Sequence, residues 1–211
     1  MEKILGLDPG ASTGYCLATI DRASSTGTIL EYGYLDIDKS AEFRGDALLD
    51  LEHQLEVLIE KHRIDHIIFE DYNFNSKQKT GMTTNIAYRA VIELVARRRK
   101  IPYNVLSISQ WKKFIAGRVT PSKEHNTKWG KVAKKVMIQE ALWLNHQLRF
   151  PNHSLSEATG KPIKFRYDVV DVVAQMVYFA RDSRKVDKIL SQVTVPADVV
   201  LADKWFVYQY R

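Results

Sequence analysis

Four acidic residues of this chain stand where an apolar element begins or ends. They are Asp8 after the apolar run 4–7, Glu70 after the run 67–69, and Asp168 and Asp171 at the head of an apolar helical pattern. A carboxylate at the end of a buried strand is costly unless it is paired, binds a cation or takes part in catalysis. Hard divalent ions such as Mg²⁺ prefer several converging carboxylate oxygens. The four acids are therefore either structurally paired or form a catalytic metal site.

The spacing of the last two acids favours the metal site. Asp168 and Asp171 are three residues apart, so on a helix they project from the same face and can approach a shared cation. If that helix packs beside the strand ends that carry Asp8 and Glu70, the four carboxylates meet and repel each other strongly without metal. We expect two Mg²⁺ ions, about 4 Å apart, with Mn²⁺ able to substitute. One ion would generate a hydroxide and the other would stabilise the departing oxygen of a phosphodiester.

Alternating apolar and turn-rich segments predict the elements that position these acids. We expect strands over 4–7, 15–20, 29–36, 66–70 and 103–106, the first three forming an antiparallel meander. Helical spacing of apolar residues predicts helices over 48–61, 83–99, 109–115, 128–144 and 168–181. Strands alternating with helices indicate an α/β protein with a mixed sheet flanked by helices. The polar segment 145–166 is expected to be a long loop.

Length and composition favour one compact catalytic domain. The 211 residues include 45% apolar residues, and we place the domain at 1–182 and an extension, packed on the domain or on a dimer partner, at 183–211. No signal-peptide pattern and no run of about 18 apolar residues occurs. Cys16 is the only cysteine, which excludes an intrachain disulfide. We expect a protein that has no membrane contact and is cytoplasmic.

Positive charge is concentrated in one part of the chain. From Arg97 to Lys135 there are twelve Lys or Arg residues and one acid, Glu124, and since the whole chain is +6 the remainder is −5. A surplus of +11 beside an acidic metal site indicates a polyanionic substrate, above all nucleic acid. The alternative for the cluster 97–100 is a helix end at which cations interact favourably with the helix dipole.

These motifs together resemble one nuclease family. The opening Ile4-Leu5-Gly6-Leu7-Asp8-Pro9-Gly10 with Thr13-Gly14-Tyr15, the strand end Phe69-Glu70 and the pair Asp168-x-x-Asp171 are similar, in order and interval, to the RuvC family of Holliday-junction resolvases. The resemblance covers residues 3–181. It implies a ribonuclease H-like fold, a homodimer, symmetric nicking of four-way DNA junctions, and Asp8, Glu70, Asp168 and Asp171 as the metal-binding catalytic acids.

The resemblance also indicates where DNA binds. Family members carry an aromatic residue near the unpaired bases of the junction, where Tyr72 and Phe74 stand here, although core packing is an alternative for both. Helical spacing places Lys128, Lys131 and Lys135 on one side, with Lys131 expected beside the scissile phosphate as a catalytic residue. The predicted DNA-contacting residues are Tyr72, Phe74, Lys77, Lys79, Lys112, Lys113, Arg118, Lys123, Lys128, Lys131 and Lys135.

Departures from the family pattern leave other functions open. The long loop before Asp168, the tail and the loosely matching segment 117–128 resemble a bacteriophage relative, which would act in the host cytoplasm and on a wider range of branched DNA. A ribonuclease H that cuts RNA–DNA hybrids and a non-catalytic junction-binding protein are the alternatives. An actin-like or sugar-kinase ATPase fits less well because the chain is short and has no second Asp-x-Gly turn. We therefore expect no nucleotide cofactor.

Overall fold

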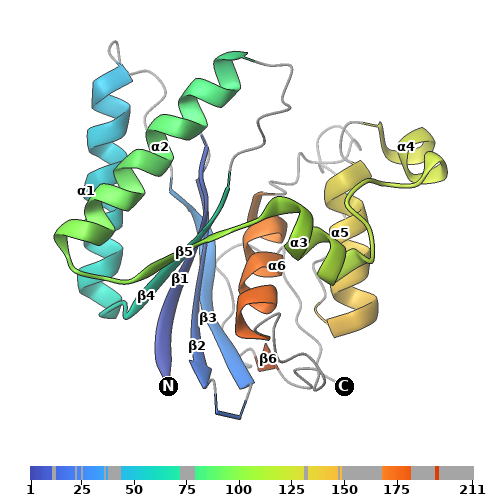
Figure 1. Ribbon diagram of the computed structural model, residues 1–211, viewed down its shortest axis with the longest axis horizontal. Helices are drawn as coiled ribbons and strands as arrows, with labels where there is room; N and C mark the ends of the chain where they lie inside the picture. Colours follow the sequence, from blue (N-terminus) through green and yellow to red (C-terminus); the bar gives the residue numbers. More distant parts are fainter. Residues whose placement is uncertain are drawn as a thin grey trace, which may run out of the picture.

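The protein is built on a twisted mixed sheet, seen in a computed structural model (Figure 1). The structure describes residues 1–10, 13–21, 23–24, 26–35, 37, 44–71, 79–130, 133–146, 148, 168–181 and 193–194. Within these ranges only the backbone is described for Arg44, for residues 79–84, for Asp168 and for residues 193–194.

The sheet has the order β5-β4-β1-β2-β3-β6. Its strands are β1 (Glu2–Asp8), β2 (Thr13–Asp21), β3 (Thr26–Leu35), β4 (His66–Glu70), β5 (Tyr103–Leu106) and β6 (Val193–Thr194). Strands β1, β2 and β3 pair antiparallel, whereas β4 pairs parallel with β1 and with β5. The predicted mixed sheet, with three antiparallel strands followed by parallel ones, is confirmed.

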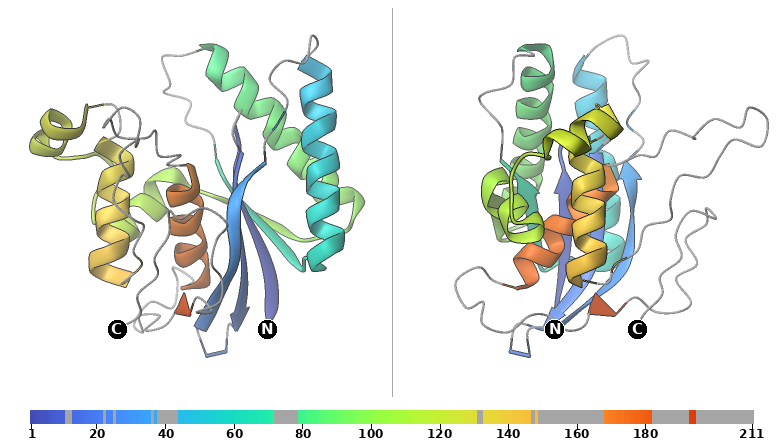
Figure 2. Two further views of the ribbon diagram at one scale, coloured as in Figure 1. Left: turned by 180° about the vertical axis from the view of Figure 1, so that it is seen from behind. Right: turned by 90° about the vertical axis from the view of Figure 1, so that its right-hand side faces the viewer.

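Helices cover both faces of the sheet (Figures 1 and 2). On one face lie α1 (Arg44–His62) and α2 (Lys79–Arg98). On the other lie α3 (Ile108–Ala116), α5 (Ala133–His146) and α6 (Asp168–Ala180), while α4 (Lys123–Trp129) packs against α5. Since both faces are buried, the central strands read as continuous apolar runs rather than as alternating ones.

Strand β1 shows how the pleat distributes its side chains between two cores. Ile4 lies in the core beneath α6, whereas Leu5 and Leu7 lie in the core beneath α1 and α2. Gly6 faces α6 so closely that an added Cβ would lie 3.1 Å from side-chain carbons of Met176 and Val172. The missing side chain lets α6 approach β1, the strand that ends in the first predicted catalytic acid.

The predicted helix over 128–144 is wrong. Instead, α4 ends at Trp129 and α5 begins at Ala133, with Gly130 between them at φ 53. A positive φ is incompatible with helix continuation and is readily adopted by glycine. Lys128 and Lys135 therefore belong to different helices, and the single face on which we placed them with Lys131 does not exist.

The end of the chain contributes one element that the sequence did not predict. Backbone pairing of Val193 and Thr194 with Gly27 and Thr28 adds β6 to the edge of the sheet. The rest of the extension 183–211 and nearly all of the predicted loop 145–166 lie outside the described residues. The division at residue 182 stays a prediction. Among the described helices, none is long and apolar enough to cross a membrane.

Candidate active site

Two of the predicted acids come together because their strands are parallel neighbours. Asp8 ends β1 and Glu70 ends β4, and the register pairs Leu7 with Phe69 directly before them. Both carboxylates therefore lie at the same end of the sheet, beside the carboxyl ends of β1 and β4. The chain turns sharply after Asp8, where the Thr13 hydroxyl donates a hydrogen bond to the Gly10 carbonyl at 2.7 Å. Thr13 is fully buried, which fixes this turn.

The third acid arrives from the helix packed across these strands. Asp171 lies in the first turn of α6, is 4% exposed, and accepts a hydrogen bond through Oδ2 from Nζ of Lys135 on α5. The same Nζ is 3.8 Å from Oδ2 of Asp8. One ammonium group thus joins carboxylates from β1 and α6. The other oxygen of Asp171, Oδ1, is buried and accepts no hydrogen bond from the described residues.

Glu70 is held by two neutral donors. Its Oε2 accepts hydrogen bonds from Nε1 of Trp111 at 3.0 Å and from Nε2 of Gln175 at 3.2 Å, and both donor residues are fully buried. Burial raises the pKa of Glu70; the positive charge of Lys112 acts against this, and the negative charge of Asp171 adds to it. Both donors therefore bind the same oxygen of Glu70.

An ion pair secures the chain directly after Glu70. The Asp71 amide donates to the Leu106 carbonyl at 2.9 Å, and its carboxylate pairs with Arg89 of α2 at 2.5 Å. Arg89 in turn contacts Glu93 at 2.7 Å and lies over the ring of Phe69. This network fixes the end of β4, on which the orientation of Glu70 depends.

The fourth predicted acid is placed only by its backbone. Asp168 is the first residue of α6, one helical turn before Asp171, and its side chain lies outside the described part of the structure. Among the side chains that are described, no group of three acidic, histidine or cysteine residues is arranged to hold a metal ion. The region between Asp8 and Asp171 is occupied by the Lys135 ammonium.

Apart from Lys135, which contacts the acids, the predicted DNA-contacting residues divide into three groups. Lys113, Arg118, Lys123 and Lys128 are exposed on α3, α4 and the segment between them, and α4 lies towards the end of the molecule that carries the acids (Figure 1). Lys112 is partly buried, with Nζ 4.7 Å from the ring centre of Trp111. Those outside the described residues, or described only in their backbone, are Tyr72, Phe74, Lys77, Lys79 and Lys131.

The basic cluster 97–100 lies at the opposite end of the sheet. It ends α2 and precedes β5, whose start is remote from the strand ends that bear Asp8 and Glu70. Arg98 pairs with Glu52 of α1, and Arg99 pairs with Glu56 and Glu60 at 2.5 and 2.6 Å. These arginines stabilise the packing of α2 on α1, so the surplus of positive charge near the acids is smaller than the sequence count.

Three residues contact the predicted acids in a way that the sequence did not predict. The roles of Trp111 and Gln175 as donors to Glu70 were not predicted, and Lys135 was assigned to DNA rather than to the acids. One signal was present for Gln175: it is a single polar residue in an apolar helical run, four residues after Asp171 and hence on the same face. Nothing in the sequence marked Trp111.

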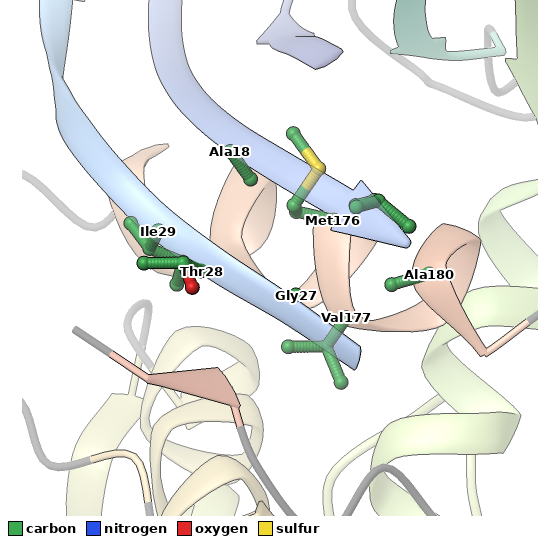
Figure 3. Close-up of a pocket in the computed structure, with 8 residues that line it drawn as sticks. Ala18, Gly27, Thr28, Ile29, Met176, Val177 and Ala180 are labelled. Carbon is green, nitrogen blue, oxygen red and sulfur yellow. The ribbon is translucent and has the colours of Figure 1, made fainter. Parts of the chain in front are cut away.

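An apolar crevice elsewhere in the fold has different properties. It lies between β2, β3 and the last turns of α6, and its lining includes Ala18, Ile29, Met176 and Val177 (Figure 3). The lining carries no titratable side chain. The predicted acid Asp171 lies at the other end of α6.

The fold and a family match show what this chain is similar to. A mixed sheet of this order, flanked by helices and carrying carboxylates on two adjacent parallel strands and on the helix across them, is ribonuclease H-like. Residues 4–148 match the family described as crossover junction endodeoxyribonuclease RuvC. The chain belongs to the RuvC family, which confirms the resemblance noted in the sequence.

Individual relatives agree with this assignment. The crossover junction endodeoxyribonuclease RuvC of Ruminiclostridium cellulolyticum is 35% identical over 111 residues, which are 51% of this chain and 64% of that protein. The chain thus aligns with less than two thirds of that relative's length. The family match ends at residue 148, before α6, so the position of Asp171 beside Asp8 comes from the fold.

Solved structures share the fold at low identity. Thermus thermophilus RuvC in complex with a Holliday junction substrate is 14% identical, with a TM-score of 0.57 over 86% of this chain and 96% of that one. The yeast mitochondrial Holliday junction resolvase Ydc2 is 19% identical, with a TM-score of 0.52 over 82% of this chain and 75% of that one. Both matches extend the likeness beyond the segment that the family match covers.

Proposed function

We propose that this chain is a divalent-metal-dependent endonuclease that cuts four-way or otherwise branched DNA by hydrolysing phosphodiester bonds. The convergence of Asp8, Glu70 and Asp171 from β1, β4 and α6, in a chain of the RuvC family, carries this proposal. The binding of a Holliday junction substrate by Thermus thermophilus RuvC, which shares the fold, supports the choice of DNA.

The donor atoms fit a hard divalent cation, for which we propose Mg²⁺, with Mn²⁺ able to substitute and two ions per site. All three described acids offer carboxylate oxygens, and Oδ1 of Asp171 is a buried acceptor without a donor among the described residues. We propose Asp168 as the fourth ligand. When bound, the metal supplies a hydroxide nucleophile and stabilises the departing oxygen.

The protein's own residues orient this chemistry. Trp111 and Gln175 bind one oxygen of Glu70, and we propose that the other binds the metal. We propose that Lys113, Arg118, Lys123 and Lys128 bind DNA phosphates, because they are exposed and lie on α3, α4 and the segment between them. Tyr72 and Phe74 would stack on bases, and Lys131 would contact the scissile phosphate.

Paired cuts across a symmetric junction require two active sites, and we propose that the chain forms a homodimer. Helix α2 packs on α1 through one face and exposes Ile86 and Leu94, eight residues apart, on its surface. Sedimentation of the purified chain tests for the dimer. We place the protein in the cytoplasm, in that of the host if a bacteriophage encodes it.

Cleavage of a synthetic four-way junction labelled in each strand tests the function directly. We expect cuts in Mg²⁺ or Mn²⁺ at paired positions in strands of like polarity. Asp8→Asn and Asp171→Asn should abolish cutting while junction binding is largely kept, since the acids act on metal and not on base sequence. Asp46→Asn, which alters an exposed acid in the first turn of α1, is the matched control and should cut normally.

Three other outcomes would contradict the proposal. Preferential cutting of RNA–DNA hybrids would indicate a ribonuclease H. Tight junction binding without cutting, in any divalent metal, would indicate a binding protein on a nuclease fold. Normal cutting by Asp8→Asn or Asp171→Asn would remove that residue from the active site. Mapping the cuts at single-nucleotide resolution then defines the range of branched substrates.

A further inference from the structure

Lys135 occupies the centre of the acidic cluster. Its Nζ donates to Oδ2 of Asp171 and lies 3.8 Å from Oδ2 of Asp8. The charge of Lys135 also interacts electrostatically with the carboxylate of Glu70, as does the charge of Asp171. One ammonium group is thus in electrostatic contact with acids from three separate elements.

The position of Lys135 is set by packing. It lies in the first turn of α5, and its neighbours Ala133 and Val136 are buried against the core beneath the sheet. Helix α5 packs against α6, the helix that carries Asp171 (Figure 1). The Lys135 side chain is 26% exposed, so part of it faces solvent.

Three carboxylates in such close proximity need a compensating positive charge. Like-charged carboxylates in a partly buried site disfavour their ionised forms unless a cation is present, and Lys135 supplies that cation from within the chain. A divalent cation that bridges Asp8 and Asp171 would lie between their carboxylates, where the Lys135 ammonium stands. The two cations cannot occupy the same place.

We propose, resting on the function proposed above, that Lys135 is an internal counter-ion of the carboxylate site and that a divalent cation enters by displacing its ammonium group from Asp171. The lysine keeps the acids together in the metal-free protein. Because Lys135 competes with the metal for the acids, it also lowers the affinity of the protein for metal. Metal binding is therefore coupled to a movement of the Lys135 side chain.

Lys134 provides a matched control. It is the preceding residue on α5, carries the same charge and is exposed. Replacing either lysine by methionine changes the net charge of the protein equally, and only Lys135 touches the acids. A difference between the two variants therefore reports the local contact and not the overall field.

The test measures Mn²⁺ binding to the DNA-free protein, with the free ion followed by electron paramagnetic resonance. Lys135→Met should bind Mn²⁺ about tenfold more tightly than the wild type, because the competing charge is gone. Lys134→Met and the charge-conserving Lys135→Arg should bind as the wild type does. Without metal, Lys135→Met should melt at a lower temperature than the wild type, and Mn²⁺ should raise its Tm by more.

A second measurement uses the wild type and does not depend on the folding of a variant. Acetylation of the lysines by an amine-reactive reagent is followed by mass spectrometry, with Lys134 as the internal reference. Adding Mg²⁺ should increase the rate at Lys135 relative to Lys134, because displacement exposes the amine. An unchanged or slower rate at Lys135 would overturn the proposal.

The outcomes also separate this proposal from the proposed function. If the wild type cuts junctions in metal but Lys135→Met binds Mn²⁺ no more tightly, the counter-ion role is wrong and the nuclease assignment stands. If no protein of the series binds Mn²⁺ and none cuts DNA, both are wrong. Tighter binding by Lys134→Met as well would assign the effect to overall charge and also refute the proposal.

Discussion

Replacing Trp111 by phenylalanine isolates one hydrogen bond to the carboxylate of Glu70, a proposed metal ligand. The indole Nε1 donates to Oε2 of Glu70 at 3.0 Å from a fully buried ring. Phenylalanine keeps an aromatic side chain in the core but has no donor. Gln175 still donates to the same oxygen at 3.2 Å, so Glu70 loses one of two restraints.

The expected effect follows from the strength of a hydrogen bond to a charged group. Such a bond contributes about 1.5–3 kcal/mol when buried, and we take about 2 kcal/mol for Trp111 because Gln175 remains. If Glu70 must be aligned in the transition state, the single-turnover cleavage rate falls about 30-fold. The affinity for the junction should stay unchanged, since Trp111 is inside the core.

The assay compares single-turnover cleavage, junction binding and thermal unfolding for three variants. Gln175→Leu removes the other donor and should slow cleavage to a similar degree. Ile115→Val is the matched control: it lies four residues after Trp111 on α3, is fully buried, and should lose about 1 kcal/mol of stability without touching Glu70. If Trp111→Phe slows cutting no more than Ile115→Val does, the orientation of Glu70 does not depend on this bond.

Two further predictions concern stability. Burial, with the nearby charge of Arg181, lowers the pKa of His146 from 6.5 to about 4, so the folded protein holds it neutral. Above pH 6.5 His146 is neutral in the folded and in the unfolded protein, so it does not reduce the free energy of unfolding. As the pH drops from 6.5 towards 4, the unfolded protein is protonated first, and the free energy of unfolding should fall by at most about 3 kcal/mol. Denaturant unfolding should show a shallower fall in His146→Phe, and an equal fall would contradict this prediction. Gly6→Ala should lose about 1–3 kcal/mol in thermal unfolding, because its Cβ would lie 3.1 Å from two side chains of α6. Gly45→Ala, whose Cβ would meet nothing within 4 Å, should be neutral or slightly stabilising. If both variants lose the same stability, crowding against α6 is not the cause of the loss in Gly6→Ala.

The sheet and the acids could be predicted because their signals are local. An apolar run that ends in an acid and a turn marks both a buried strand and its terminus, and this applies to Asp8 and to Glu70. Parallel pairing then brings the two strand ends together without any further information from side chains. The strand 103–106 is observed with the predicted bounds, because apolar and turn residues delimit it on both sides.

The helices between the last strand and α6 were predicted less well. Helical spacing of apolar residues favoured one helix over 128–144, but such spacing does not reveal the backbone conformation of a single residue. Gly130 adopts φ 53, which ends α4 and allows α5 to start in a new direction. As a result Lys135 reaches the acids, while Lys128 lies exposed on α4 with its ammonium 5.0 Å from the ring centre of Trp129.

The charge surplus between residues 97 and 135 shows what a linear count leaves out. Its members take different roles because tertiary contacts, and not sequence position, decide which acids they meet. Arg98 and Arg99 pair with glutamates of α1 at the end of the sheet remote from Asp8, and Lys135 pairs within the acidic site itself. Under the proposed function, the cations of this surplus that are described as exposed near the acids would release counter-ions from DNA. The salt dependence of junction binding should therefore reflect the exposed residues of α3 and α4, and it should be smaller than the full surplus of +11 would give.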